Sequence, residues 1–264
     1  MYIRRFAENA MTPAILAAGA NKVAQPEMAL RQELAAAYRL AARFGWEDST
    51  STHFTVRLPG PGRETLINHH GELYDEVTAS SLVKVGLGGE VIAPAGARVN
   101  TAGFTLHSAI HTARPDALCV MHCHSVASTA VGAQEQGLLP LSGAAMTLYG
   151  AVGYHGFEGL RITEEEMPRL LANLGDHKAL ILRNHGTLTL GPTVAACFQR
   201  MFYLEKACQM QIAAMAGGAR LMLPDAALAK QAQDEFTAMA PNEGQLNWTA
   251  WLRALDRSEP GYRD

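Results

Sequence analysis

Three histidines at the ends of two apolar segments have the spacing of a divalent-metal site. His122 and His124 follow the apolar run 117–121, and His185 follows the apolar run 179–182. Side chains alternate between the two faces of a strand, so His122 and His124 would point the same way. Three imidazoles with an open position are the donor set of a catalytic site for zinc or a similar metal. One histidine alone could be a hydrogen-bonded core residue, but the set of three favours a metal site.

Apolar periodicity predicts the elements that would position these residues. Apolar residues recur at helical spacing from Pro26 to Phe44, which predicts a helix that ends at Gly45. Further helices are expected over 103–113, 125–133, 170–174, 193–216 and 225–239. Short apolar or alternating runs predict strands over 54–58, 65–67, 82–87, 90–92, 117–121 and 179–182. Thr163 and Glu166 form a capping-box pair, whereas 138–154 reads only as a mixture of loop and short strand.

Composition bounds the organisation and the partners. The chain has 264 residues, of which 48% are hydrophobic and 18% charged, enough for one α/β domain with extra terminal segments. We expect an N-terminal arm (1–26), a main domain (27–218) and a C-terminal helix and tail (219–264) that packs on the domain or on a neighbour. A formal net charge of -3 without a basic cluster argues against nucleic acid and membrane binding. A small-molecule substrate is the expected partner.

The cysteines indicate a reducing compartment. Cys119, Cys123, Cys197 and Cys208 lie in apolar stretches without CxxC spacing, which argues against disulfides and against a thiolate zinc site. The apolar stretch 13–20 is too short for a membrane span and lacks the apolar core of a secretory signal. A cytoplasmic protein is therefore expected.

Several longer motifs resemble the class II aldolase/adducin family over about 29–217. They are EVTASSLVK at 76–84, VNTAGFTLHSAIH at 99–111, ARPD at 113–116, HCH at 122–124 and RNHG at 183–186. The resemblance implies a three-layer α/β/α fold around a central, mainly antiparallel sheet, and a cyclic homotetramer with active sites between neighbouring subunits. It also implies that His122, His124 and His185 bind the metal, with zinc expected and manganese or iron as alternatives.

The chain departs from the family's sugar-phosphate aldolases where those enzymes handle substrate. In them, a glutamate four residues before a helix histidine is the acid/base group, and the matching residue before His107 is Gly103. Their small phosphate-binding residues are replaced by THFT at 52–55, NHHG at 68–71 and Thr101-Ala102. Imidazoles at these places would fill a phosphate pocket or bind a carboxylate.

These matches define the predicted substrate side of the site. His70 is the predicted catalytic residue, although a loop histidine such as His69 or His70 is otherwise simply solvated. The predicted substrate-binding residues are His53, His70, Gly71, Thr101 and Gly103.

Three other side chains have a simpler interpretation. His107 and His111 are spaced to chelate a metal from one helix, but an exposed or capped polar helix face is the favoured interpretation. Glu205 stands where family members often carry a glutamate on a long helix, and a surface or interface salt bridge is expected there.

Three functions remain open. The favoured one is a metal-dependent lyase for a carbon-carbon bond of a small oxo or hydroxy acid, a decarboxylase or an aldolase-like enzyme, because Gly103 argues against a sugar-phosphate aldolase. The second is an adducin-like interaction module without catalysis. Adducin, whose head domain this chain resembles, lacks the full metal triad. The intact triad His122, His124 and His185 therefore favours an enzyme over an interaction module. The third is an Fe(II) oxygenase that uses the three-histidine site.

Overall fold

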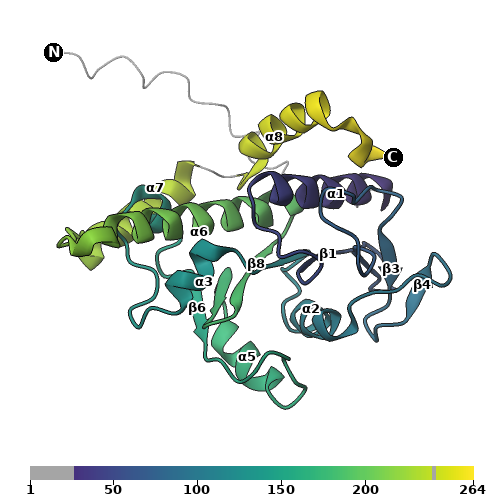
Figure 1. Cartoon of the computed structure of the whole chain (residues 1–264), viewed down its shortest axis with the longest axis horizontal. Coiled ribbons are helices and arrows are strands. Elements are labelled where there is room, and N and C mark those ends of the chain that lie inside the picture. Colours follow the sequence, from purple (N-terminus) through teal and green to yellow (C-terminus); the bar gives the residue numbers. More distant parts are fainter. Residues whose placement is uncertain (1–26, 240–241) are drawn as a thin grey trace, which may run out of the picture.

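A computed structural model describes residues 27–239 and 242–264, and in these residues an eight-stranded sheet lies between two helical layers (Figure 1). The strands are β1 His53–Arg57, β2 Thr65–Ile67, β3 Val83–Val85, β4 Val91–Ala93, β5 Cys119–Cys123, β6 Val152–His155, β7 Ala179–Leu182 and β8 Gly186–Gly191. Their order is β4-β3-β2-β1-β5-β8-β7-β6. All neighbours pair antiparallel except β6 and β7, which are parallel. The three-layer, mainly antiparallel fold predicted from the sequence is confirmed.

Helices cover both faces of the sheet (Figure 1). The α-helices are α1 Glu27–Arg43, α2 Thr101–Ala113, α3 Val126–Gly132, α4 Gly143–Met146, α5 Met167–Leu174, α6 Val194–Met215, α7 Ala226–Met239 and α8 Gln245–Ser258. Two 3-10 turns, Ala216–Gly218 and Pro260–Arg263, follow α6 and α8. Helices α1, α6 and α8 pack on one face of the sheet, and α2 and α5 pack on the other. Strands β1 and β5 therefore lie in the middle of the molecule, buried on both sides.

Helix α1 shows how sequence pattern becomes packing. Leu34 and Tyr38 recur at helical spacing and are fully buried against the sheet. The Tyr38 hydroxyl donates to the Phe54 carbonyl over 2.7 Å, so the helix is hydrogen-bonded to β1 as well as packed on it. Gly45 then turns the chain with φ 69°, a conformation that suits glycine, and ends the helix where the sequence predicts.

Most predicted elements are confirmed within a few residues, including the reciprocal capping box of Thr163 and Glu166. The unassigned segment 138–154 contains α4 and the beginning of β6. The predicted N-terminal arm lies outside the described residues. The C-terminal tail packs on its own chain, because Trp248 and Tyr262 are buried in the same core as α1 and α6.

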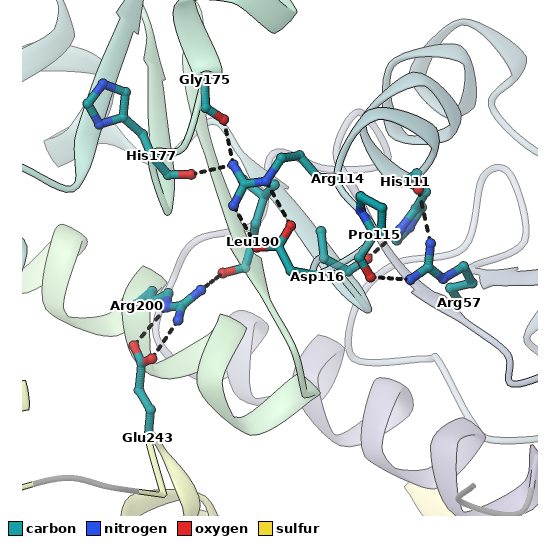
Figure 2. Close-up of polar contacts among 11 residues, drawn as sticks. Arg57, His111, Arg114, Pro115, Asp116, Gly175, His177, Leu190, Arg200 and Glu243 are labelled. Carbon is teal, nitrogen blue, oxygen red and sulfur yellow. Dashed lines mark hydrogen bonds and ion pairs between the residues drawn. The ribbon is translucent and has the colours of Figure 1, made fainter. Parts of the chain in front are cut away.

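A network of arginines joins the segments at the start of β5 (Figure 2). Arg114 donates to Asp116 over 2.8 and 2.7 Å and to the carbonyls of Gly175 and His177 over 2.7 and 2.9 Å. Arg57 donates to the carbonyl oxygens of residues 111 and 115 over 3.0 and 2.6 Å. Arg57 thus satisfies backbone acceptors where α2 ends, and Arg114 of the ARPD motif does so where α5 ends. No helix within 27–239 or 242–264 has the length and apolar character needed to cross a membrane.

Candidate metal centre

The three predicted metal ligands meet at the end of β5 opposite the arginine network. His122 lies in β5, His124 directly follows it, and His185 lies in the turn between β7 and β8. Their ligand nitrogens all lie within 4.8 Å of one another. Gly186 makes this approach possible, since a Cβ atom there would lie 2.4 Å from the Cys123 carbonyl oxygen and 2.7 Å from the His124 ring. The three side chains meet as the sequence predicts.

Hydrogen bonds fix which nitrogen each of two imidazoles presents. The Thr187 carbonyl can only accept, so His122 donates to it from Nδ1 over 3.0 Å. His124 Nδ1 lies 2.8 Å from the Asp48 carboxylate, which likewise makes that nitrogen the donor. In the neutral form that binds metal, both Nε2 atoms carry lone pairs, and they lie 2.9 Å apart. Two lone pairs in this arrangement repel each other unless a cation lies between them.

The arrangement fits a divalent metal ion. Bonds of about 2.0–2.1 Å to a tetrahedral zinc separate two ligand nitrogens by about 3.3 Å, so a small opening of the pair would admit the ion. Carboxylate and carbonyl acceptors behind the ligands are the usual partners of metal-binding histidines. Burial above all, and the nearby imidazoles, lower the pKa of His122 well below its ordinary value, and burial also lowers the pKa of His185. Neutral imidazoles are the form that binds metal.

A cavity of about 260 Å³ opens beside the three histidines. Besides the three metal ligands it is lined by Ser51, His53, Asn100, Ala102, Gly103, Leu106, Leu160, Arg161 and Ile162. Asn100 caps α2, where its side chain accepts from the backbone of Gly103 over 3.1 Å. None of the described lining residues is acidic, and Arg161 carries a fixed positive charge. The cavity suits a small anion.

His53 occupies the space that a side chain at position 103 would need. A Cβ atom on Gly103 would lie 2.1 Å from the His53 ring. The ring is 3% exposed, and neither of its nitrogens makes a hydrogen bond to the described residues. Burial lowers the pKa of His53 to about 4, with the Gly103 and Ser51 backbones acting in the opposite direction, so the ring is neutral near pH 7. His53 is thus not a solvated loop residue: it is buried, begins β1 and lines the cavity.

Behind His53, a chain of hydrogen bonds orients His107. His111 Nδ1 donates to the Ala117 carbonyl over 2.9 Å, which leaves His111 Nε2 to accept from the Thr55 hydroxyl over 2.8 Å. Thr55 in turn accepts from His107 Nδ1 over 2.7 Å, so His107 Nε2 is a bare acceptor, buried and without a partner in the part of the chain that the structure describes. The expected exposed polar face is wrong for this pair. Both rings are buried against β1, at 0% and 1% exposure.

The remaining predicted substrate residues lie at other places. His70 and Gly71 are exposed in the turn after β2, and Thr101 is exposed at the first position of α2. None of the three lines the cavity within this chain. Their roles stay predictions. The sequence reading missed Asp48, which lies in an irregular segment before β1, and Arg161, since neither belongs to a periodic pattern or a quoted motif.

Two acidic groups near the site have structural partners. Glu205 is 2% exposed and accepts from the Ser125 hydroxyl, so the predicted surface salt bridge is wrong. Burial raises the pKa of Glu205, against the effect of its hydrogen bonds. His155 and Glu166, buried beside Glu158, also have metal-ligand spacing, but their 2.9 Å hydrogen bond anchors the loop before α5.

Comparison with known proteins identifies the family. Residues 32–212 match the model of the class II aldolase and adducin N-terminal domain. A Caulobacter vibrioides protein named for the class 2 aldolases is 46% identical over 92% of this chain and 95% of its own length. The chain therefore belongs to the class II aldolase/adducin family, as its motifs predict.

Other similar proteins are an adducin and proteins named as aldolases. Alpha-adducin of Rattus norvegicus is 47% identical over 72% of this chain, which spans only 26% of that longer protein. The structure of an aldolase II superfamily protein from Pseudomonas syringae has a TM-score of 0.85 and 44% identity, and covers 92% of this chain and 98% of its own. The L-fuculose 1-phosphate aldolase of Glaciozyma antarctica has a TM-score of 0.79 and 29% identity, and covers 90% and 93%.

Proposed function

We propose that this protein is a divalent-metal-dependent lyase that breaks a carbon-carbon bond of a small oxo or hydroxy acid. The observation that carries the proposal is the convergence of His122, His124 and His185, whose ligand nitrogens lie within 4.8 Å of one another, beside a cavity without acidic groups among its described lining residues. A bound divalent ion would supply Lewis-acid polarisation of a carbonyl or hydroxyl oxygen. Zinc suits the histidine donors, and manganese or iron are alternatives.

The chain's own residues orient the ligands and contact the substrate. Asp48 and the Thr187 carbonyl hold the His124 and His122 rings with Nε2 towards the site. His53 lines the cavity, and its N–H donor and its bare nitrogen have no partner in the described residues, so a substrate carboxylate or carbonyl could satisfy the donor.

Glycine at position 103 separates the proposed reaction from sugar-phosphate cleavage. Loss of carbon dioxide itself leaves an electron pair on carbon, so a decarboxylase needs no carboxylate to remove a proton from carbon. General acid/base groups contribute about 10²- to 10⁴-fold to rate. The L-fuculose 1-phosphate aldolase that resembles this chain supports carbon-carbon cleavage as the reaction class. The imidazole of His53 supports an acid as the substrate.

The proposal is tested with two substrate panels. Metal-loaded protein is assayed for carbon dioxide or aldehyde release from 2-oxo, 3-oxo and hydroxy acids, and from sugar phosphates that include L-fuculose 1-phosphate. We expect turnover of an acid and little cleavage of sugar phosphates. His122→Ala serves as the blank because it removes one ligand. Robust cleavage of a sugar phosphate by the native protein would overturn the proposal.

A second candidate function is an interaction module without catalysis. The observation that favours it is 47% identity with a segment of alpha-adducin. Metal analysis of protein purified without added metal separates the two candidates: about one metal ion per chain supports the lyase, and none supports the interaction module.

Assembly as a homotetramer in the cytoplasm is also part of the proposal. The family resemblance supports the tetramer, and four free, buried cysteines are compatible with a reducing compartment. Light scattering at micromolar concentration tests the assembly, and a monomer there would contradict it, since closed symmetric interfaces of this kind are stable at that concentration.

A further inference from the structure

Arg161 differs from the other charged groups near the metal centre in having no partner among the described residues. It lies on the loop between β6 and α5 and lines the same cavity as His122, His124 and His185. Within the described residues, its guanidinium makes no hydrogen bond, ion pair or ring contact, and it is exposed. A cationic group on a cavity wall is therefore available to a ligand.

The loop that carries Arg161 is anchored on both sides of it. Before it, Glu158 forms a two-pronged ion pair with Arg169 of α5. After it, Glu166 accepts from the buried ring of His155 over 2.9 Å and closes the capping box of α5. Glu158 and Glu166 are thus occupied by Arg169 and His155. The two pairs fix the ends of the loop segment that carries Arg161.

The charge and shape of this cavity wall select for oxyanions. The described lining residues contribute one guanidinium and no carboxylate, so nothing in the wall competes with a ligand for Arg161. A guanidinium offers parallel N–H donors that match the two oxygens of a carboxylate or phosphate. Because the three histidines line the same cavity as Arg161, it offers two kinds of polar group to one ligand. Its 260 Å³ lies below the range of about 300–1,000 Å³ of pockets for drug-sized ligands, which suits a small metabolite.

We propose that Arg161 determines specificity by binding a second oxyanion group, a carboxylate or a phosphate, at the end of the substrate remote from the three histidines. The inference builds on the proposed function and narrows its substrate class from a small acid to a small dianion. Arg161 would contact the substrate directly. His53, which also lines the cavity, remains free to contact the end held near the histidines.

Equilibrium binding tests the inference without turnover. Zinc-loaded protein is titrated calorimetrically with glycolate, L-malate and phosphoglycolate, which share a carboxylate but differ in the second oxyanion. We expect native protein to bind at least one dianion about tenfold to a hundredfold more tightly than glycolate, the range for hydrogen bonds to a charged group. Malate and phosphoglycolate distinguish a second carboxylate from a phosphate.

Three variants connect this preference to Arg161. Arg161→Ala should reduce the dianion preference to less than about threefold while glycolate affinity stays the same, and Arg161→Lys should keep part of it. Arg220→Ala is the matched control, because Arg220 is also exposed and without a partner in the described structure but does not line the cavity. Thermal melting should show both alanine variants folded.

The inference is overturned if Arg161→Ala keeps the native preference, if it weakens all three acids equally, or if native protein binds glycolate as tightly as both dianions. Failure to bind any of the three at millimolar concentration also overturns it. Failure of the lyase assays is a separate result. It would leave the affinity ratio and its dependence on Arg161 intact.

Discussion

The two ends of β5 carry polar clusters of opposite kinds. At the start of the strand, Arg114 and Asp116 pair with each other, and Arg57 and Arg114 donate to the backbone carbonyls around them (Figure 2). At the other end, both ring nitrogens of His53 and Nε2 of His107 are buried without partners among residues 27–239 and 242–264. The two clusters are thus separated by one five-residue strand.

The difference shows which polar groups stabilise the fold and which are kept for a ligand. Buried polar groups are normally hydrogen-bonded, and an unsatisfied one costs about 1–3 kcal/mol. The unsatisfied nitrogen atoms of His53 belong to a residue that lines the cavity, where a ligand could supply their partners. The histidine end therefore has the character of a binding site, and the arginine end that of a structural joint.

The largest expected effect is on metal binding at the histidine end. His122→Ala should lose the metal, because two remaining imidazoles cannot complete the site. Zinc at about 1,000 times its dissociation constant stabilises native protein by about 4 kcal/mol, and this gain should vanish in the variant. Thermal melting with and without zinc measures it. An equal zinc-induced shift in His122→Ala and native protein would rule out His122 as a ligand.

The next largest effect is on stability at the arginine end. Arg114→Ala leaves two backbone carbonyls without their donor and should lower the free energy of unfolding by about 2–3 kcal/mol. Urea denaturation of metal-free protein measures the change. Arg220→Ala, at an exposed arginine without a partner in the described structure, should stay within about 0.5 kcal/mol of native protein. If both variants unfold at the same urea concentration as native protein, the arginine end is not a structural joint.

A smaller effect concerns pH. Burial lowers the folded-state pKa of His53 and of His111 from 6.5 to about 4. Between pH 4 and 6.5 these two histidines are therefore protonated in the unfolded chain but neutral in the folded chain. The resulting stability is present above pH 6.5 and is lost as the pH falls towards 4, by more than about 1 kcal/mol for each histidine. Urea denaturation of metal-free protein between pH 4 and 8 measures the slope.

The arginine end provides the control for this pH dependence. Hydrogen bonding to Arg114 lowers the pKa of Asp116 below its ordinary value, so Asp116 stays ionised across the same window. Asp116→Asn should therefore keep the native slope between pH 5 and 7. A flat native profile over that range would show that the buried histidines do not titrate as described.

The smallest effect expected is that of His53→Leu on stability. Leucine fills the space of the imidazole without its two unsatisfied nitrogens, so the free energy of unfolding of metal-free protein should stay the same or rise by up to about 1 kcal/mol. Substrate or probe-acid affinity should fall in the same variant. A loss of stability above about 1 kcal/mol would instead assign His53 to the core.

The meeting of the three candidate ligands could be predicted because it follows simple rules. Strand alternation places His122 and His124 on one side, and the RNHG motif after the next apolar run supplies His185. The exposed or capped polar face predicted for His107 and His111 is wrong for a physical reason: α2 packs against β1, whose Thr55 offers a hydrogen-bond partner that no helical pattern reveals.

Loop residues and long-range partners limited the rest. Arg161 and Asp48 lie in irregular segments, where spacing along the chain says little about position in space. Glu205 was expected at the surface because a lone charge on a helix usually is. Only the fold shows that Glu205 is buried and accepts a hydrogen bond from the Ser125 hydroxyl, eighty residues earlier in the chain.

The fit between Gly103 and His53 also fixes an order of mutational steps. Any side chain at position 103 would meet the His53 ring at its first carbon, so glutamate cannot enter there while histidine occupies position 53. A smaller residue at 53 removes the collision and opens room for the carboxylate. The two positions are therefore epistatic, and a path from this chain to a glutamate-bearing aldolase passes through residue 53 first.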